Sequence, residues 1–173
     1  MKVSFPRLAL SLALAALGCG CSVDTAPTDL RTLDRSFSPN DALACPPASC
    51  TAKADIESPA FALEPAQLGE IVRGVVTGQA RTELVGEDPE MGQLVFVQRS
   101  KVFGFADTIW VQIVDLESRT SIIIYSRSNF GFWDLGVNAR RVRSWLAEIE
   151  SAAVPAGKRR AGTGVTETGA GPA

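Results

Sequence analysis

The chain has 173 residues, of which 46% are hydrophobic and 21% are charged, a composition that allows one globular domain with terminal tails. Its formal net charge is −2, and its sequence contains no histidine. The acidic balance argues against general nucleic-acid binding, which needs a basic surface. The lack of histidine excludes the catalytic triads and general acid–base pairs that are built on that residue.

The first residues have the pattern of an export signal. Lys2 and Arg7 give a positive start, and Leu8–Leu17 is an apolar run too short to span a membrane, which needs about 20 residues. We therefore predict a lipoprotein signal peptide over residues 1–18. The alternative is a plain signal peptide cut near Ala16.

A sequence similar to a bacterial lipobox ends this signal. Small residues precede Cys19, as in the motif whose cysteine is diacylated and becomes the first residue of the mature protein. Cys21 is a competing site. Two acyl chains on one residue give stable anchoring. We expect an exported, membrane-anchored lipoprotein, on the outer membrane facing the periplasm if the cell is Gram-negative.

Composition divides the rest of the chain into three parts. Residues 19–43 are rich in Ser, Thr, Asp and Pro and are expected to form a flexible tether that holds the domain off the membrane. Residues 44–153 are expected to form a single domain. Residues 154–173 are rich in Gly, Ala and Thr and are expected to be a disordered tail.

The domain has two predicted helices with four predicted strands between them. Pro65 suits the first position of a helix, apolar residues recur after it at helical spacing, and Gly78 ends it. A second helix with one apolar face is predicted from Asn138 to Ala152. The order favours an α+β fold: a four-stranded antiparallel meander flanked by an N-terminal and a C-terminal helix, both packed on one face. The predicted strands are Ala80–Val85, Gln93–Ser100, Asp107–Asp115 and Ser121–Arg127.

Cys45 and Cys50 are separated by four residues, of which two are prolines. In an oxidising compartment this spacing favours a local disulfide. A metal site is disfavoured, because two thiolates without histidine do not complete the usual four-ligand shell. The sequence also lacks the glycine motifs that cradle phosphates, so we expect no metal and no cofactor.

Chemically active side chains are dense in Ser126–Arg143, which joins the last predicted strand to the last helix. Arg140 and Arg141 lie at the start of that helix, where its dipole disfavours positive charge. One explanation is that Asp134 caps the helix and pairs with Arg141, which would close the corner. The other is that Arg127, Arg140 and Arg141 bind a phosphate, a carboxylate or an acidic partner.

Three aromatic residues, Phe130, Phe132 and Trp133, lie in the same corner. They either plug the end of the sheet or present an apolar surface to a partner or a membrane. A Phe-Gly-Phe sequence at 103–105 is a candidate bulge that brings Asp107 toward the corner, where we expect it to contact Arg127 or Arg141.

The corner resembles the pattern S-x-S-x-x-G-x-x-D-x-G-x-N-x-x-R of domain-of-unknown-function family 1499, which is found in bacteria and plastids. Weaker blocks agree at 103–107 and at 45–50, and the resemblance covers roughly residues 45–149. It implies a fold and a compartment, with no established activity to carry over. The chain departs from the pattern at Asn129 and Ala139, where arginines are expected, at Thr108, where a second acid is expected, and in having no histidine after the cysteines. The matching corner residues are Ser126, Ser128, Gly131, Asp134, Gly136, Asn138 and Arg141.

These features favour a non-enzymatic binding or interaction module of the cell envelope. The alternative is a binder or enzyme that acts on a small anionic ligand through an Asp/Arg cluster. An open pocket lined by that cluster would favour the alternative, whereas a closed, salt-bridged corner would favour the module. The expected partners are the membrane, through the lipid, and an envelope protein or a small anionic ligand; nucleic acid is not expected. We name no catalytic residue, and the candidate contact residues are Asp107, Arg127, Ser128, Asp134, Asn138, Arg140 and Arg141.

Overall fold

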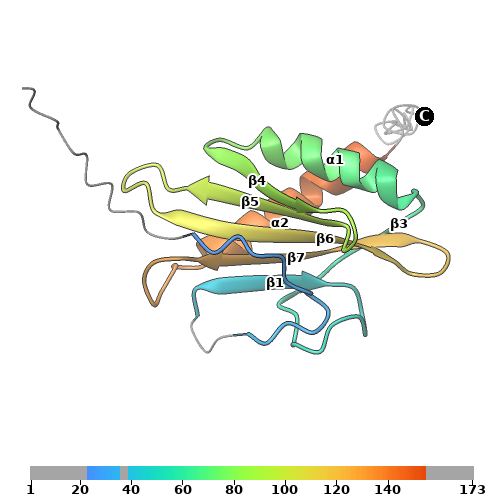
Figure 1. The fold of residues 1–173 in the computed structure, drawn as a ribbon, viewed down its shortest axis with the longest axis horizontal. Coiled ribbons are helices and arrows are strands. Elements are labelled where there is room, and N and C mark those ends of the chain that lie inside the picture. The colour runs from blue at the N-terminus through green and yellow to red at the C-terminus, as the bar shows by residue number, and fades with distance from the viewer. Residues whose placement is uncertain (1–22, 36–38, 155–173) are drawn as a thin grey trace, which may run out of the picture.

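The computed structural model describes residues 23–35 and 39–154. The architecture is α+β, with two helices and a seven-stranded, mostly antiparallel sheet (Figure 1). Among the described residues, no helix is long and apolar enough to cross a membrane. The predicted signal peptide, both candidate anchor cysteines and tail residues 155–173 lie outside the described part of the chain.

Four consecutive strands form the centre of the sheet and follow the predicted order. They are β4 (Thr82–Asp88), β5 (Gln93–Arg99), β6 (Ala106–Asp115) and β7 (Thr120–Ser128), each antiparallel to the next. The predicted four-stranded sheet is nevertheless too small, because three further strands join it. These are β1 (Asp41–Cys45) beside β7, β2 (Ile56–Glu57) parallel to β1, and β3 (Ala60–Phe61) against the start of β7.

The segment expected to be a tether, residues 19–43, belongs to the fold over most of its described length. It crosses the face of the sheet opposite the helices (Figure 1). Leu30 is fully buried there, and Trp110 Nε1 donates a hydrogen bond to the Ala26 carbonyl oxygen at 2.9 Å. Strand β1 already begins at Asp41. The folded part therefore starts well before the expected boundary at residue 44.

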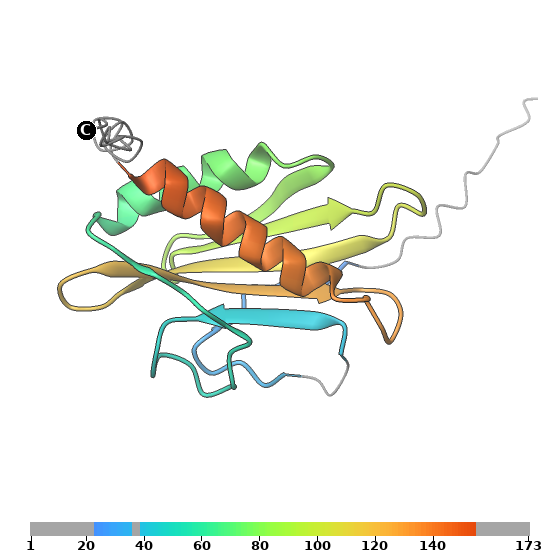
Figure 2. The same cartoon turned by 180° about the vertical axis from the view of Figure 1, so that it is seen from behind.

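Both helices cover one face of the sheet (Figure 2). α1 (Pro65–Thr77) and α2 (Val137–Ala153) direct their apolar residues into the main core, which they form with the central strands. Phe96 and Trp145 meet edge-on in this core, with ring centroids 6.4 Å apart.

A second, smaller core lies on the opposite face, where Trp110 and Tyr125 stack with ring centroids 5.7 Å apart. Side chains along β7 alternate between the two cores, as in any strand. Ile122 and Ile124 belong to the main core, whereas Ile123 and Tyr125 belong to the smaller one. This alternation decides on which face each polar residue at the end of β7 lies.

The predicted disulfide between Cys45 and Cys50 is confirmed and closes the turn after β1. The two Cα atoms are 6.4 Å apart. In the described ranges, no group of three or more His, Cys, Asp and Glu side chains is placed to hold a metal ion.

Candidate functional site

Arg141 and Asp107 form an ion pair at the centre of the corner between β7 and α2. Arg141 Nη2 lies 2.5 Å from Asp107 Oδ2, and the two side chains keep only 7% and 12% of their surface exposed. Arg141 Nε donates to Gln98 Oε1 at 2.5 Å. Nη1 donates to Ser126 Oγ at 2.9 Å and to Asn138 Oδ1 at 2.5 Å. All three guanidinium nitrogens therefore have protein partners.

Asn138, the second residue of α2, is fully buried and joins several segments of the chain. Its Nδ2 donates to the Asn40 carbonyl oxygen at 2.8 Å, to Ser128 Oγ at 3.0 Å and to Asp134 Oδ2 at 2.8 Å. Its Oδ1 accepts a hydrogen bond from Ser126 Oγ at 2.6 Å. Buried networks of this kind are rigid when every member is satisfied. We call Asp107, Ser126, Asn138 and Arg141 the corner network.

Asp134 caps α2 from the loop before it. Its Oδ1 accepts from the Gly136 backbone N–H at 2.8 Å, and its Oδ2 accepts from the Asn138 N–H at 2.7 Å. Gly136 has a φ of 72°, which glycine adopts without the steric cost of a Cβ. The carboxylate thus satisfies donors at the positive end of the helix dipole. The expected ion pair between Asp134 and Arg141 is not formed, because Asp134 turns to these donors and Arg141 pairs with Asp107.

Replacing Asp134 with alanine should lower the free energy of unfolding by about 1–3 kcal/mol, because it removes the acceptor of these donors. The matched control is Arg140→Ala. Arg140 is exposed and donates from Nη1 to the Leu135 carbonyl oxygen, so its loss should change stability by less than about 0.5 kcal/mol. Urea denaturation of both variants measures the difference. Equal stability of the Asp134→Ala protein and the wild type would rule out the cap as a support of the corner.

Arg127 lies on the other face of the sheet from Arg141, since its neighbours Ser126 and Ser128 point toward the helix side. Its guanidinium carbon is 5.6 Å from the centroid of the Trp110 ring, and its Nη2 lies 3.4 Å from Asp24 Oδ2. The structure therefore does not bring Arg127 together with Arg140 and Arg141, the three arginines of the alternative anion site.

Two departures from the family pattern contact each other. Asn129 Nδ2 donates to Thr108 Oγ1 at 2.8 Å. Positions 129 and 108, at which the pattern implies an arginine and an acid, are therefore joined by a hydrogen bond between two neutral side chains.

Large apolar side chains are exposed on the two loops beside the corner network, β5–β6 and β7–α2. Phe105 stacks on Phe103 with ring centroids 5.4 Å apart, and on Phe130 with ring centroids 4.7 Å apart. The contact with Phe130 joins the two loops. Trp133 exposes 70% of its surface. The aromatics therefore form an exposed surface and do not plug the sheet. We call this surface the aromatic tip; it consists of Phe103, Phe105, Phe130, Phe132, Trp133 and Leu135.

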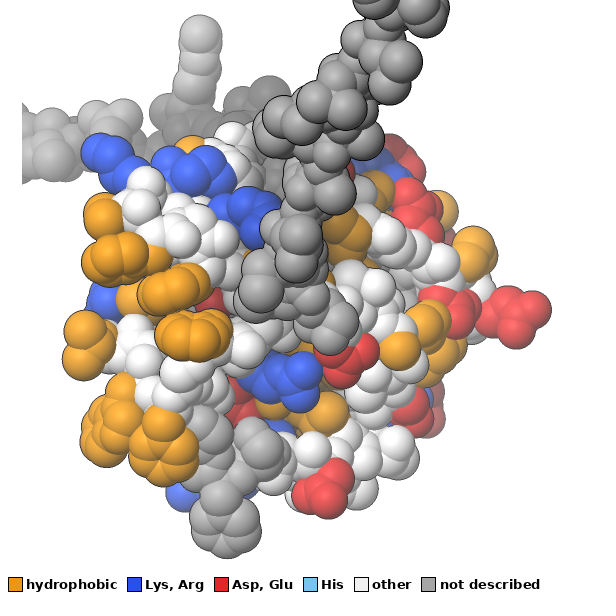
Figure 3. All heavy atoms as spheres, turned by 60° about the vertical axis from the view of Figure 1, so that its left-hand side comes forward, with side chains coloured by type: hydrophobic (Ala, Val, Ile, Leu, Met, Phe, Trp, Pro, Cys, Tyr) orange, Lys and Arg blue, Asp and Glu red, His pale blue; other side chains and the backbone are white. Residues whose placement is uncertain are grey.

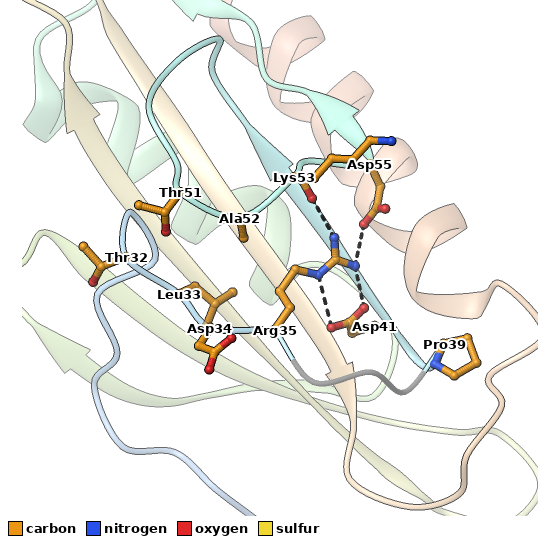
Figure 4. Close-up of a pocket in the computed structure, with 10 residues that line it drawn as sticks. All are labelled: Thr32, Leu33, Asp34, Arg35, Pro39, Asp41, Thr51, Ala52, Lys53 and Asp55. Atoms are coloured by element: carbon orange, nitrogen blue, oxygen red, sulfur yellow. Dashed lines mark hydrogen bonds and ion pairs between the residues drawn. The ribbon is translucent and has the colours of Figure 1, made fainter.

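A second ionic cluster, not anticipated from the sequence, lies near the start of β1 (Figure 4). Arg35 Nη2 lies 2.6 Å from Asp41 Oδ1 and 2.8 Å from Asp55 Oδ2. Burial by itself would lower the pKa of Arg35, but the hydrogen bonds from Arg35 to the two carboxylates raise that pKa overall. Tyr125 donates its hydroxyl to Asp41 Oδ2 at 2.9 Å, and burial together with the charge of Asp41 raises the pKa of Tyr125.

This cluster borders a surface depression of about 700 Å³, lined by Arg35, Asp41 and Asp55 among others (Figure 4). Arg35 Nη1 also donates to the Lys53 carbonyl oxygen at 2.8 Å. The guanidinium is thus occupied by its own chain, and the cluster ties the segment before β1 to the sheet.

The candidate contact residues fall into three places. Arg140 is exposed at the rim of the corner, and Arg127 lies on the opposite face. Gln98 and Asn40 take part in the corner but were not expected to. The sequence offers one signal for Gln98: it is a polar residue that directly follows the apolar residues of β5. The corner itself brings together Asp107, Ser128, Asp134, Asn138 and Arg141.

A family model described as a protein of unknown function, DUF1499, matches residues 27–149, which is more than half of the chain. No curated protein matches the sequence. The matched range includes the corner network, the aromatic tip and the disulfide.

Proposed function

The chain belongs to the DUF1499 family of proteins of unknown function, and we propose that it is a lipid-anchored, non-enzymatic binding module of the cell envelope. Its contact surface is the aromatic tip, and the corner network is the rigid support beneath it. The supporting observation is the contrast between the two: the Arg141–Asp107 pair is closed by its own chain, whereas six large apolar side chains beside it are exposed. Exposed apolar patches mark contacts with proteins or membranes. The proposal predicts that the tip is covered in the intact envelope.

A binder or enzyme for a small anionic ligand takes second place, because the residues it needs are engaged. Arg141 uses all three guanidinium nitrogens within the chain, and Asp107 faces Arg141. The Asp134 carboxylate accepts hydrogen bonds from the start of α2. A general base must reach the proton of a substrate, and these carboxylates face protein donors. Of the described candidate residues, Arg140 is the cation that such a ligand would reach first.

The anchor half of the proposal is tested by metabolic labelling with a clickable fatty acid. The wild-type chain should be labelled, Cys19→Ser should lose most of the label, and Cys21→Ser, as the matched control, should keep it. Unchanged labelling of Cys19→Ser would move the anchor to Cys21. A wild-type chain without label would remove the anchor from the proposal.

A further inference from the structure

The aromatic tip is rimmed by basic side chains. Lys101 lies in the β5–β6 loop itself. Arg99 and Arg140 each donate a hydrogen bond to the backbone of a tip loop. Arg81, just before β4, donates to the carbonyl oxygen of Arg99 at 3.0 Å. All four side chains belong to exposed residues, so the tip combines an apolar surface with a positive rim.

Three acidic groups at this end of the sheet are paired, and one exposed acid, Glu83 near the start of β4, stands against the four basic side chains. Asp134 accepts a hydrogen bond from a backbone N–H at the start of α2. Asp107 forms an ion pair with Arg141, and Asp24 forms one with Arg127. The tip is thus positive although the whole chain has a formal charge of −2. Figure 3 shows hydrophobic side chains gathered on one side of the molecule with Lys and Arg beside them, whereas most Asp and Glu in this view lie on the other side.

The described chain enters the fold at the end of the sheet that carries the tip. Asp24 contacts Arg127, one residue before the end of β7. The five residues from Cys19 to Asp24 span at most about 18 Å when fully extended. The ten residues of β6 place the opposite end of the sheet about 30 Å farther away. An anchor at Cys19 would therefore hold the tip, and not the opposite end, against the membrane.

We propose that the aromatic tip inserts into the headgroup region of an anionic bilayer, the same membrane that carries the anchor. This inference rests on the proposed function, which supplies the anchor. Aromatic side chains favour the membrane–water interface. Each basic side chain close to an anionic surface favours insertion roughly fivefold. The tip thereby fixes the orientation of a domain that the lipid alone would only tether.

Trp133 reports insertion directly, because the other two tryptophans, Trp110 and Trp145, are buried. The full chain with its anchor is reconstituted into vesicles of phosphatidylglycerol and phosphatidylcholine, in which part of the lipid carries bromine high on the acyl chains. Bromine should quench most of the Trp133 emission. The control Trp133→Phe should show only the emission of the buried pair, without quenching. Vesicles of phosphatidylcholine alone should give little quenching.

The positive rim is tested with Lys101→Gln and Arg140→Gln. Each change should lower the ratio of inserted to free tip roughly fivefold in the anionic vesicles. The matched control is Arg119→Gln in the β6–β7 hairpin, at the opposite end of the sheet, and it should leave the ratio unchanged. Equal quenching in neutral and anionic vesicles would overturn the assignment of an anionic bilayer.

Flotation of the same vesicles reports the anchor independently of the tip. A chain that floats but shows no quenching of Trp133 overturns insertion and leaves the proposed function standing. In that case, crosslinking of the tip to an envelope protein would assign the surface to a protein partner. A chain that neither floats nor is quenched overturns both the anchor and the insertion.

Discussion

Replacing Arg141 with methionine is expected to lower the free energy of unfolding by about 3–5 kcal/mol. The change removes the partner of Asp107, whose side chain is 12% exposed and whose carboxylate would remain buried without a counter-charge. It also removes the donors that face Gln98 and Ser126. Urea denaturation with the disulfide intact measures the loss.

Two controls separate this ion pair from the general effect of removing an arginine. Arg143→Met, two residues farther along α2 and exposed, should change stability by less than about 0.5 kcal/mol. The double variant Asp107→Asn, Arg141→Met should be more stable than Arg141→Met alone, because the unpaired buried charge is gone. Wild-type stability in Arg141→Met would contradict the view of the corner as a closed support.

Replacing Asn138 with leucine should lower the free energy of unfolding by about 2–4 kcal/mol, since leaving a buried polar group unsatisfied costs about 1–3 kcal/mol and several are affected. The Asn40 carbonyl oxygen loses one of its two donors and keeps the Ser128 backbone N–H, and the Ser126 hydroxyl loses its acceptor. The size of leucine is similar, so the loss would come mainly from the hydrogen bonds.

Asn129→Leu is the matched control for Asn138→Leu. Asn129 is half-buried, and its side chain donates one hydrogen bond, to Thr108. A typical hydrogen bond contributes about 0.5–1.5 kcal/mol, so the loss should be clearly smaller. Equal losses in the two variants would mean that Asn138 has no special place in the corner.

The elements with a clear apolar period could be predicted from the sequence, because burial on one face dictates that period. β7 was expected at 121–127 and spans Thr120–Ser128, and α1 begins at Pro65 as expected. β1 was not predicted, because Asp-Ala-Leu-Ala-Cys lacks the β-branched and aromatic residues that are typical of strands. Its pairing with β7 depends on residues at least 80 positions away, such as Asp41 opposite Arg127.

The residues of the corner were named from the sequence, but their partners were not all found. Arg141 was assigned to Asp134, and Asp107 was expected to contact either Arg127 or Arg141. The strand register places Asp107 opposite Ser128, and the pair formed is the one with Arg141. Register is a tertiary property that local spacing does not determine. Arg127 lies on the far face because side chains along β7 alternate between the two faces of the sheet. This was not anticipated, since the last residues of a strand are the hardest to assign to a face from sequence.

The central claim is that the aromatic tip is the surface through which the protein contacts its partner in the envelope, and hydroxyl-radical footprinting of intact envelopes tests it most directly. The readout is the oxidation of Trp133 relative to Met91, which lies in the β4–β5 turn at the opposite end of the sheet. The urea-unfolded chain supplies the reference ratio. Trp133 is 70% exposed in the structure, so an uncovered tip would be oxidised almost as in the unfolded chain. We predict that Trp133 is protected several-fold while Met91 is oxidised; a Trp133 that is oxidised as readily as in the unfolded chain would contradict the account.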